Sequence, residues 1–321
     1  MGLVFPNPIG LAAGFDKNGK RARALEALGF GHLELGTVTA EAQGPNPAPN
    51  LFRLPSDRAL VNRLGFPNEG ATSVSERVVA RKVGARIPIG MSIGKSRSVP
   101  LDPLDKALED YVTSFKAVQP AADFVVVNIS SPNTKDLRAL QAADMARQLF
   151  TTLMTQGSAV PLLVKIAPDL PDDAVDAICV EADRAGLAGV VATNTTISRD
   201  GLATASSDIE RIGAGGLSGL PLFPRALSVV KRARARLGPN ACVIGAGGVN
   251  GTESALAMLR AGADLVQIYT SFIYEGPLLP RTILRGLARH MDVEGAKALA
   301  DLVGSTAPAT RALGQGAAAR L

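Results

Sequence analysis

The sequence of 321 residues has no tryptophan, and it has only two histidines and two cysteines. Aromatic residues make up 4% of the chain, so a buried core has to be built from Ala, Val, Leu and Ile. Cys179 and Cys242 lie far apart and in no CxxC spacing, which argues against a disulfide framework and a thiolate metal site. We therefore expect no metal, and a reducing cytosolic compartment fits this cysteine usage.

Long apolar runs are also missing. No stretch approaches the roughly 18 uninterrupted apolar residues of a transmembrane helix, and residues 1–14 lack the basic region that opens a signal peptide. The net charge of +5 is modest and slightly favours anionic small molecules or an anionic membrane surface. The one dense basic run, 231–236, has the pattern of a helix end, so we expect no nucleic acid as a partner.

Short apolar runs alternate with longer amphipathic segments along most of the chain. The expected strands are 9–15, 32–38, 87–93, 123–129, 162–167, 189–193, 241–245 and 265–269, and the expected helices are 18–29, 73–83, 103–118, 135–155, 172–185, 223–237, 251–261 and 280–290. This order predicts an α/β fold of the (β/α)8 TIM-barrel type. A doubly wound sheet is the competing interpretation, but its G-x-G-x-x-G turn is absent after the first strand.

Two connections are unusually long, 39–70 and 197–221. Both follow expected strands, so we place both long loops on the C-terminal face of the barrel, where such enzymes carry out their chemistry. We expect residues 1–303 to form a single barrel domain. The Ala- and Gly-rich tail, 304–321, has no strand pattern and is expected to be frayed or disordered.

Lys165 stands within an apolar strand, which points its side chain into the barrel. Three interpretations remain open: a structurally paired lysine, a Schiff-base nucleophile, or a fixed positive charge beside an electron-accepting ring. The glycine runs 213–216 and 245–248 follow two late strands and predict a phosphate site, although such runs also form simple turns.

Side-chain amides recur where expected strands end. They could present alternating donors and acceptors to a flat heterocycle, although asparagine is also a common turn residue; the four positions are Asn62, Asn128, Asn133 and Asn194. Neither His32 nor His290 falls at such a strand end, so a proton-transfer enzyme would need another base. Ser131 is the candidate, against the alternative of a plain Ser-Pro turn, and a serine base needs close placement because its hydroxyl resists ionisation.

The stretch 128–134, NISSPNT, resembles the active-serine motif of the class 2, quinone-dependent dihydroorotate dehydrogenases. The resemblance continues along nearly the whole chain, in the segments AAGFDK (12–17), ELGTVT (34–39), NRLGF (62–66), VKIAPDL (164–170), ATNTT (192–196), GGLSG (215–219), GAGGV (245–249) and LVQIYT (265–270). Serine rather than cysteine at position 131 is similar to class 2.

The resemblance implies an FMN enzyme that oxidises (S)-dihydroorotate to orotate in de novo pyrimidine biosynthesis. It implies that Ser131 removes the C5 proton, that the C6 hydride passes to N5 of FMN, and that quinone reoxidises the flavin. It also implies that Lys165 is the cation beside the ring edge where negative charge gathers on reduction.

The resemblance further implies two sets of binding residues. The cofactor set is Ala13, Gly14, Phe15, Asp16, Lys17, Thr37, Ser92, Asn128, Lys165, Thr193, Gly219, Gly248, Tyr269 and Thr270. The substrate set is Lys17, Asn62, Arg63, Leu64, Gly65, Phe66, Asn128, Asn133, Asn194 and Thr195.

Three features depart from the family pattern. Class 2 members carry an N-terminal helical segment that docks on the membrane, whereas this sequence begins directly on the barrel. With such a segment the protein would lie peripherally on the cytoplasmic side of the cell membrane, and without it in the cytoplasm. Ser92 and Pro67 stand where the family usually has asparagine, with Asn68 as a candidate replacement for the second amide.

Two rival functions stay open on the residues alone. One is a Schiff-base aldolase or lyase that uses Lys165 on the same barrel. The other is a catalytically impaired barrel that binds flavin or phosphate without turnover.

Overall fold

The computed structural model describes residues 1–82 and 86–304. Within these residues eight parallel strands close into a barrel in the order β1-β11-β10-β8-β7-β6-β5-β2. They are β1 (Ile9–Leu11), β2 (His32–Val38), β5 (Ile89–Ile93), β6 (Phe124–Asn128), β7 (Leu162–Ile166), β8 (Gly189–Ala192), β10 (Cys242–Ala246) and β11 (Leu265–Ile268). The predicted TIM barrel is confirmed. The single-domain span stays a prediction, and most of the expected tail, 305–321, lies outside the described residues.

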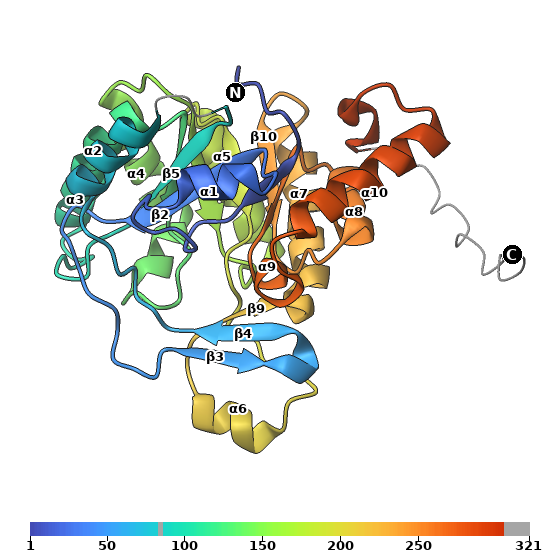
Figure 1. The fold of residues 1–321 in the computed structure, drawn as a ribbon. Helices are drawn as coiled ribbons and strands as arrows, with labels where there is room; N and C mark the ends of the chain where they lie inside the picture. Colours follow the sequence, from blue (N-terminus) through green and yellow to red (C-terminus); the bar gives the residue numbers. More distant parts are fainter. Residues whose placement is uncertain (83–85, 305–321) are drawn as a thin grey trace, which may run out of the picture.

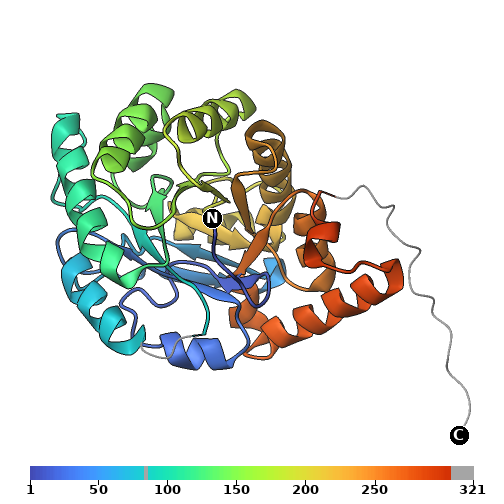
Figure 2. The same cartoon turned by 90° about the horizontal axis from the view of Figure 1, so that it is seen from above.

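Helices surround the barrel, as Figure 2 shows in a view turned by 90°. They are α1 (Ala22–Ala27), α2 (Ala71–Lys82), α3 (Leu104–Val118), α4 (Ala143–Thr155), α5 (Asp172–Arg184), α7 (Phe223–Leu237), α8 (Thr252–Arg260) and α10 (Leu279–Glu294). In α3 the buried side chains Tyr111, Phe115 and Val118 recur at helical spacing and face the strands. Of the helices in the described part, none has the length and apolar character needed to cross a membrane.

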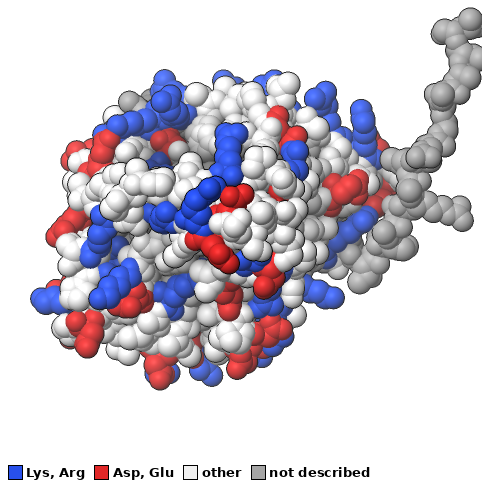
Figure 3. All heavy atoms as spheres, turned by 90° about the horizontal axis from the view of Figure 1, so that it is seen from below, with Lys and Arg blue, Asp and Glu red and all other residues white. Residues whose placement is uncertain are grey.

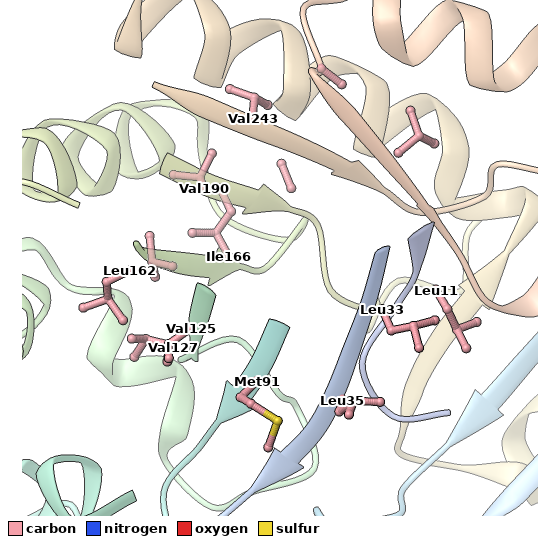
Figure 4. Packing of buried hydrophobic residues seen from close by; sticks show 14 of the residues in the cluster. Leu11, Leu33, Leu35, Met91, Val125, Val127, Leu162, Ile166, Val190 and Val243 are labelled. Carbon is pink, nitrogen blue, oxygen red and sulfur yellow. The ribbon is translucent and has the colours of Figure 1, made fainter. Parts of the chain in front are cut away.

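The strands are buried on both faces, which explains why their sequences are apolar without alternation. Val125 and Val127 belong to the large cluster between strands and helices, part of which Figure 4 shows. Their neighbours Phe124 and Val126 belong to a second cluster, with Leu163 and other strand residues. Because side chains alternate along a strand, these two clusters lie outside and inside the barrel wall.

The same alternation places polar side chains inside the barrel nearer the C-terminal strand ends. Asn128 follows Val126 on the inner face, Lys165 follows Leu163, and Gln267 follows Leu265. The interior is therefore apolar at its amino end and polar at its carboxyl end. This polar layer forms the floor of the site.

The two long connections meet on the C-terminal face, as predicted. They form an antiparallel sheet of β3 (Leu51–Leu54), β4 (Ala59–Asn62) and β9 (Gly216–Gly219), in the order β3-β4-β9. Figure 1 shows this sheet and α6 (Ser206–Ile212) set apart from the barrel. The sheet has its own small core, which includes Leu54, Val61 and Leu217.

Several short elements were not predicted. The expected helix 135–155 is divided, because Ala142 between its two parts is extended, with φ −65° and ψ 135°. The additional elements are α9 (Thr270–Glu275) and the 3-10 turns η1 (Pro55–Asp57), η2 (Gln119–Ala121), η3 (Leu137–Gln141), η4 (Leu220–Leu222) and η5 (Leu299–Leu302).

Candidate active site

A cavity lies between the carboxyl ends of the barrel strands and the β3-β4-β9 sheet. Its space, open mouth included, is about 1270 Å³. Figure 3 views the molecule from the side of this sheet, where Lys and Arg side chains lie near the middle of the face beside acidic ones. A cavity at this end of the barrel is where TIM-barrel enzymes bind their substrates.

Most of the predicted site residues line this one cavity, although they come from segments spread along the chain. They are Ala13, Gly14, Lys17, Thr37, Asn62, Leu64, Gly65, Phe66, Asn128, Ser131, Asn133, Lys165, Thr193, Asn194, Thr195, Gly219, Gly248, Tyr269 and Thr270. The strand ends collect them, because parallel strands of a closed barrel all end on the same face.

Two predicted residues from the first loop do not line the cavity but hold its wall. The Asp16 carboxylate accepts hydrogen bonds from the backbone N–H groups of Lys20 and Arg21, at 2.9 Å and 2.7 Å. The Phe15 ring packs edge-on against Tyr269, with the ring centroids 5.6 Å apart. Both side chains therefore fix the loop whose backbone reaches the cavity at Gly14.

Arg63 and Ser92 also lie behind the lining. The Arg63 guanidinium donates to the carbonyl oxygens of Ile212 and Ala214 and stacks over the Phe52 ring, 4.8 Å from its centroid. Ser92 is fully buried, and its Oγ lies 3.0 Å from Oγ1 of Thr37. Ser92 therefore does not line the cavity itself but contacts the lining residue Thr37 through this pair of hydroxyl groups.

The expected replacement of an amide by Asn68 is wrong. Its side chain accepts hydrogen bonds from the N–H groups of Thr39 and Gly70 and donates to Oγ1 of Thr39 and the carbonyl oxygen of Phe66. All its hydrogen-bonding capacity is used to hold the loop together. Asn68 therefore does not supply the side-chain amide that the family usually has at position 67.

Ser131 lies in the turn after β6 and is 4% exposed. Its Oγ accepts a hydrogen bond from the backbone N–H of Asn133 at 3.2 Å. No histidine, lysine or carboxylate in the described part of the chain hydrogen-bonds to it. The hydroxyl can thus exchange a proton with a molecule in the cavity, with one backbone dipole directed at its oxygen.

The amide side chains form a network with fixed orientation. Asn128 donates from Nδ2 to Oγ1 of Thr37 at 3.1 Å and accepts at Oδ1 from the Ser130 hydroxyl at 2.9 Å. Asn194 donates from Nδ2 to Oγ of Ser130 at 3.0 Å. Asn133 donates to Oδ1 of Asn62 at 3.2 Å. The network assigns the oxygen and nitrogen of each amide.

Two lysines supply positive charge. Lys17 donates from Nζ to the carbonyl oxygen of Gly14, and burial lowers its pKa while the Asp16 carboxylate opposes that shift. Lys165 is 5% exposed, and its Nζ lies 3.9 Å from Oε1 of the buried Glu34. The lysines face the same cavity from different walls, a suitable setting for an anionic molecule.

Glycines shape part of the cavity wall. At Gly219, with φ 107°, a Cβ would lie 2.3 Å from the Arg58 carbonyl oxygen, and at Gly248, with φ 72°, a Cβ would lie 2.6 Å from Cβ of Phe223. The N–H groups of Gly247 and Gly248 have no acceptor among the described residues. Free N–H groups on such a turn suit an anion.

The first predicted glycine run does not share this position. Gly213 and Ala214 are exposed and outside the cavity lining. At Gly215 a Cβ would lie 2.8 Å from the carbonyl oxygen of Asn62. This run packs against the β3-β4 hairpin, so only the second run, 245–248, reaches the predicted phosphate end.

Some lining residues were missed. Arg58 and Tyr274 lie at the mouth, where the guanidinium is 5.5 Å from the ring centroid and also pairs with Glu275. Arg58 lies in the turn between η1 and β4, and Tyr274 lies in the short helix α9, and neither segment has a periodic signal. Gln267 carried a signal, because it is a polar residue in a buried strand like Lys165.

The fold and the position of the cavity define a TIM-barrel enzyme. Residues 1–291 match the family model described as dihydroorotate dehydrogenase. The chain belongs to this family.

Known relatives agree with the assignment. The chain is 51% identical over 310 residues to dihydroorotate dehydrogenase (quinone) of Thermobifida fusca, covering 94% of this chain and 81% of the relative. It is 51% identical over 300 residues to the protein of the same name from a Nocardioides species, covering 90% of this chain and 84% of the relative. The crystal structure of a DHODH from Eimeria tenella in complex with ferulenol is similar, with a TM-score of 0.88 and 34% identity, over 94% of this chain and 86% of that one.

Proposed function

We propose that the chain oxidises dihydroorotate to orotate in pyrimidine biosynthesis, with quinone as the electron acceptor. The family match over residues 1–291 and the quinone-dependent relatives support this reaction. The observation that carries it in the structure is the convergence of Ser131, four amides and two lysines on one cavity. The Schiff-base aldolase reading does not agree with the family.

We infer that the cavity holds FMN. Its lining combines backbone groups of glycines, hydroxyls, amides and a buried lysine, which are the kinds of group that a phosphate and a flat polar ring need. The free N–H groups of Gly247 and Gly248 suit the phosphate, and Thr270 and Tyr269 lie beside them in the lining. Lys165, Thr37, Thr193 and Asn128 would lie along the ring. When bound, FMN supplies an acceptor for the substrate hydride and passes the electrons to quinone.

The substrate is a small anion with two ring carbonyl groups, and further residues of the cavity lining match it. The Lys17 ammonium is partly desolvated, so a substrate carboxylate would restore a favourable partner for its charge. Asn62, Asn128, Asn133 and Asn194 offer fixed amide donors and acceptors for the ring C=O and N–H groups.

Ser131 acts as the base that removes the proton from the substrate carbon adjacent to the oxidised one. To act as a base the hydroxyl must first pass its own proton to solvent through the open mouth of the cavity; the Asn133 N–H, 3.2 Å from the oxygen, stabilises the negative charge that remains, and this oxygen then takes the proton from the substrate carbon. The near-complete burial of the hydroxyl strengthens this interaction because water is excluded.

A quinone acceptor dissolves in lipid, so we also propose that a chain carrying the family's N-terminal helical segment contacts the cytoplasmic side of the cell membrane peripherally, as the family resemblance implies. Sedimentation of a protein that carries this segment, together with anionic lipid vesicles, tests this contact. Protein that stays in the supernatant at every lipid concentration would contradict it.

The function is tested by anaerobic mixing of the purified, FMN-loaded protein with dihydroorotate while the flavin absorbance is followed. We expect bleaching, and faster recovery of the colour with a water-soluble quinone than with fumarate. A yellow protein that dihydroorotate does not bleach would instead identify a catalytically impaired flavin-binding barrel.

A further inference from the structure

A buried carboxylate lies inside the barrel next to Lys165 and has no part in the reaction described so far. Glu34 stands on β2 and is 1% exposed. It is not among the residues that line the cavity. It comes from the interior face, two positions after His32, and so lies in the polar layer at the carboxyl end of the barrel.

The two oxygens of this carboxylate have different surroundings. Oε2 accepts a hydrogen bond from Nε2 of Gln267 on β11 at 2.8 Å. Oε1 has no hydrogen-bond partner and lies 3.9 Å from Nζ of Lys165 on β7. That separation is too long for a hydrogen bond but well within the range of a strong charge interaction in a buried site.

The hydrogen bond from Gln267 therefore limits how closely the Glu34 carboxylate approaches the Lys165 ammonium, and so how much of the lysine charge it neutralises. The Gln267 amide holds one carboxylate oxygen on the β11 side of the barrel and keeps the carboxylate from closing onto the ammonium. Among the described residues Lys165 has no hydrogen-bond acceptor, so its N–H groups remain available to the cavity. Glu34 therefore holds the Lys165 ammonium in place but neutralises its positive charge only in part.

We propose that Glu34 and Gln267 are a pair of positioning residues that set the place and the effective charge of Lys165, and through it the reduction potential of the bound flavin. This inference rests on the proposed function, because it takes FMN as the occupant of the cavity. Reduced flavin carries more negative charge than oxidised flavin, and a nearby positive charge stabilises it. The negative charge of Glu34 offsets part of the positive charge of Lys165 and so weakens the stabilisation of reduced flavin. Gln267 limits this loss because it holds Glu34 away from Lys165.

We predict that substitutions at the two positions shift the reduction potential of the flavin in opposite directions. Glu34→Gln removes the negative charge with little change of shape, so the potential should rise. Gln267→Met removes the amide donor, so Glu34 should move towards Lys165 and the potential should fall. A tenfold change in the preference for reduced over oxidised FMN corresponds to about 30 mV for this two-electron couple, and we expect shifts of at least that size.

The test is a spectroscopic redox titration of the FMN-loaded proteins against reference dyes. Glu181→Gln is the matched control, because Glu181 is also a buried carboxylate with one unpartnered oxygen, on α5 outside the barrel. The control should keep the wild-type potential. General destabilisation does not produce shifts of opposite sign, so melting temperatures recorded alongside separate the two effects.

Unchanged potentials in both variants, or shifts of both in the same direction, would overturn the proposal. If one variant fails to fold, the sign of the other decides. A wild-type protein that binds no FMN, or that dihydroorotate does not reduce, would overturn the proposed function. A wild-type protein that passes both checks while the variants show no shift would overturn this inference alone.

Discussion

The side-chain amide of Asn194 donates a hydrogen bond to the hydroxyl of Ser130, 3.0 Å away. The two residues are 64 positions apart, and the same hydroxyl donates to Oδ1 of Asn128 at 2.9 Å. The neighbouring Ser131 makes neither contact. The two serines thus have different roles, because Ser130 orients the amides and Ser131 faces the cavity.

Ser130→Ala should weaken substrate binding. The variant loses one buried hydrogen bond on each of two amides, at about 0.5–1.5 kcal/mol each, so we expect KM for dihydroorotate to rise by about fivefold at least and at most about 150-fold. The single-turnover rate of flavin reduction at saturating substrate should change less than KM. Steady-state and stopped-flow measurements check the split, and a loss confined to the saturating rate would contradict the orienting role.

Lys17→Met should lower the affinity for orotate. A hydrogen bond to a charged group contributes about 1.5–3 kcal/mol, which corresponds to roughly 10- to 150-fold. Because burial lowers the Lys17 pKa, wild-type affinity should also decline as pH rises, at a lower pH than for an ordinary lysine. Titration of the flavin spectrum with orotate measures both effects. Lys20→Met, at an exposed lysine that pairs with Glu69, is the control, and equal losses in both variants would count against Lys17.

His32 should make the protein sensitive to acid. It is fully buried without a hydrogen-bond partner, and burial lowers its pKa to about 3. The unfolded chain binds a proton near pH 6.5 and the folded one does not, so stability is lost as pH falls below 6.5. The loss is about 2 kcal/mol between pH 7 and pH 5.

Urea unfolding of the wild type and His32→Leu at both pH values isolates this contribution. The stability of the wild type relative to the variant should fall by about 2 kcal/mol on going to pH 5. His290→Gln, at a partly exposed histidine beside Glu253, serves as the control for loss of an imidazole elsewhere in the protein. A difference between wild type and His32→Leu that does not vary with pH would rule out the titration of His32.

Neither cysteine should react in the folded protein. Burial raises the pKa of both Cys179 and Cys242 to about 12, so the reactive thiolate is scarce at pH 8. We expect a chromogenic thiol reagent to label no cysteine in the native state and two after denaturation. Rapid labelling of either thiol without loss of the native far-ultraviolet spectrum would contradict the burial of that side chain.

Much of the barrel could be predicted because its strands carry their own signal. Strand β2 has the predicted bounds, and the interior position of Lys165 followed from its apolar neighbours. The same argument applies to Glu34 and Gln267, which are polar residues in buried strands. Their significance depends on a side-chain contact inside the barrel between β2 and β11, the two strands that flank β1, and these two residues are more than 200 positions apart in the chain.

The sheet over the cavity could not be predicted in this way. Strand β4 pairs with β9 through the register Leu60↔Ser218, and neither short segment has a periodic pattern that reveals its partner. The position of Arg63 also could not be predicted from the sequence. Its motif suggested a substrate contact, whereas its guanidinium donates to the carbonyl oxygens of Ile212 and Ala214.

The central claim is that Ser131 removes a substrate proton inside the cavity that holds the flavin. The most direct measurement is anaerobic stopped-flow reduction of FMN by dihydroorotate in wild type and Ser131→Ala. Loss of a positioned base costs about 10²- to 10⁴-fold, so we predict a variant that binds FMN and orotate like the wild type and is reduced at least a hundredfold more slowly. Reduction of Ser131→Ala at the wild-type rate would contradict the account.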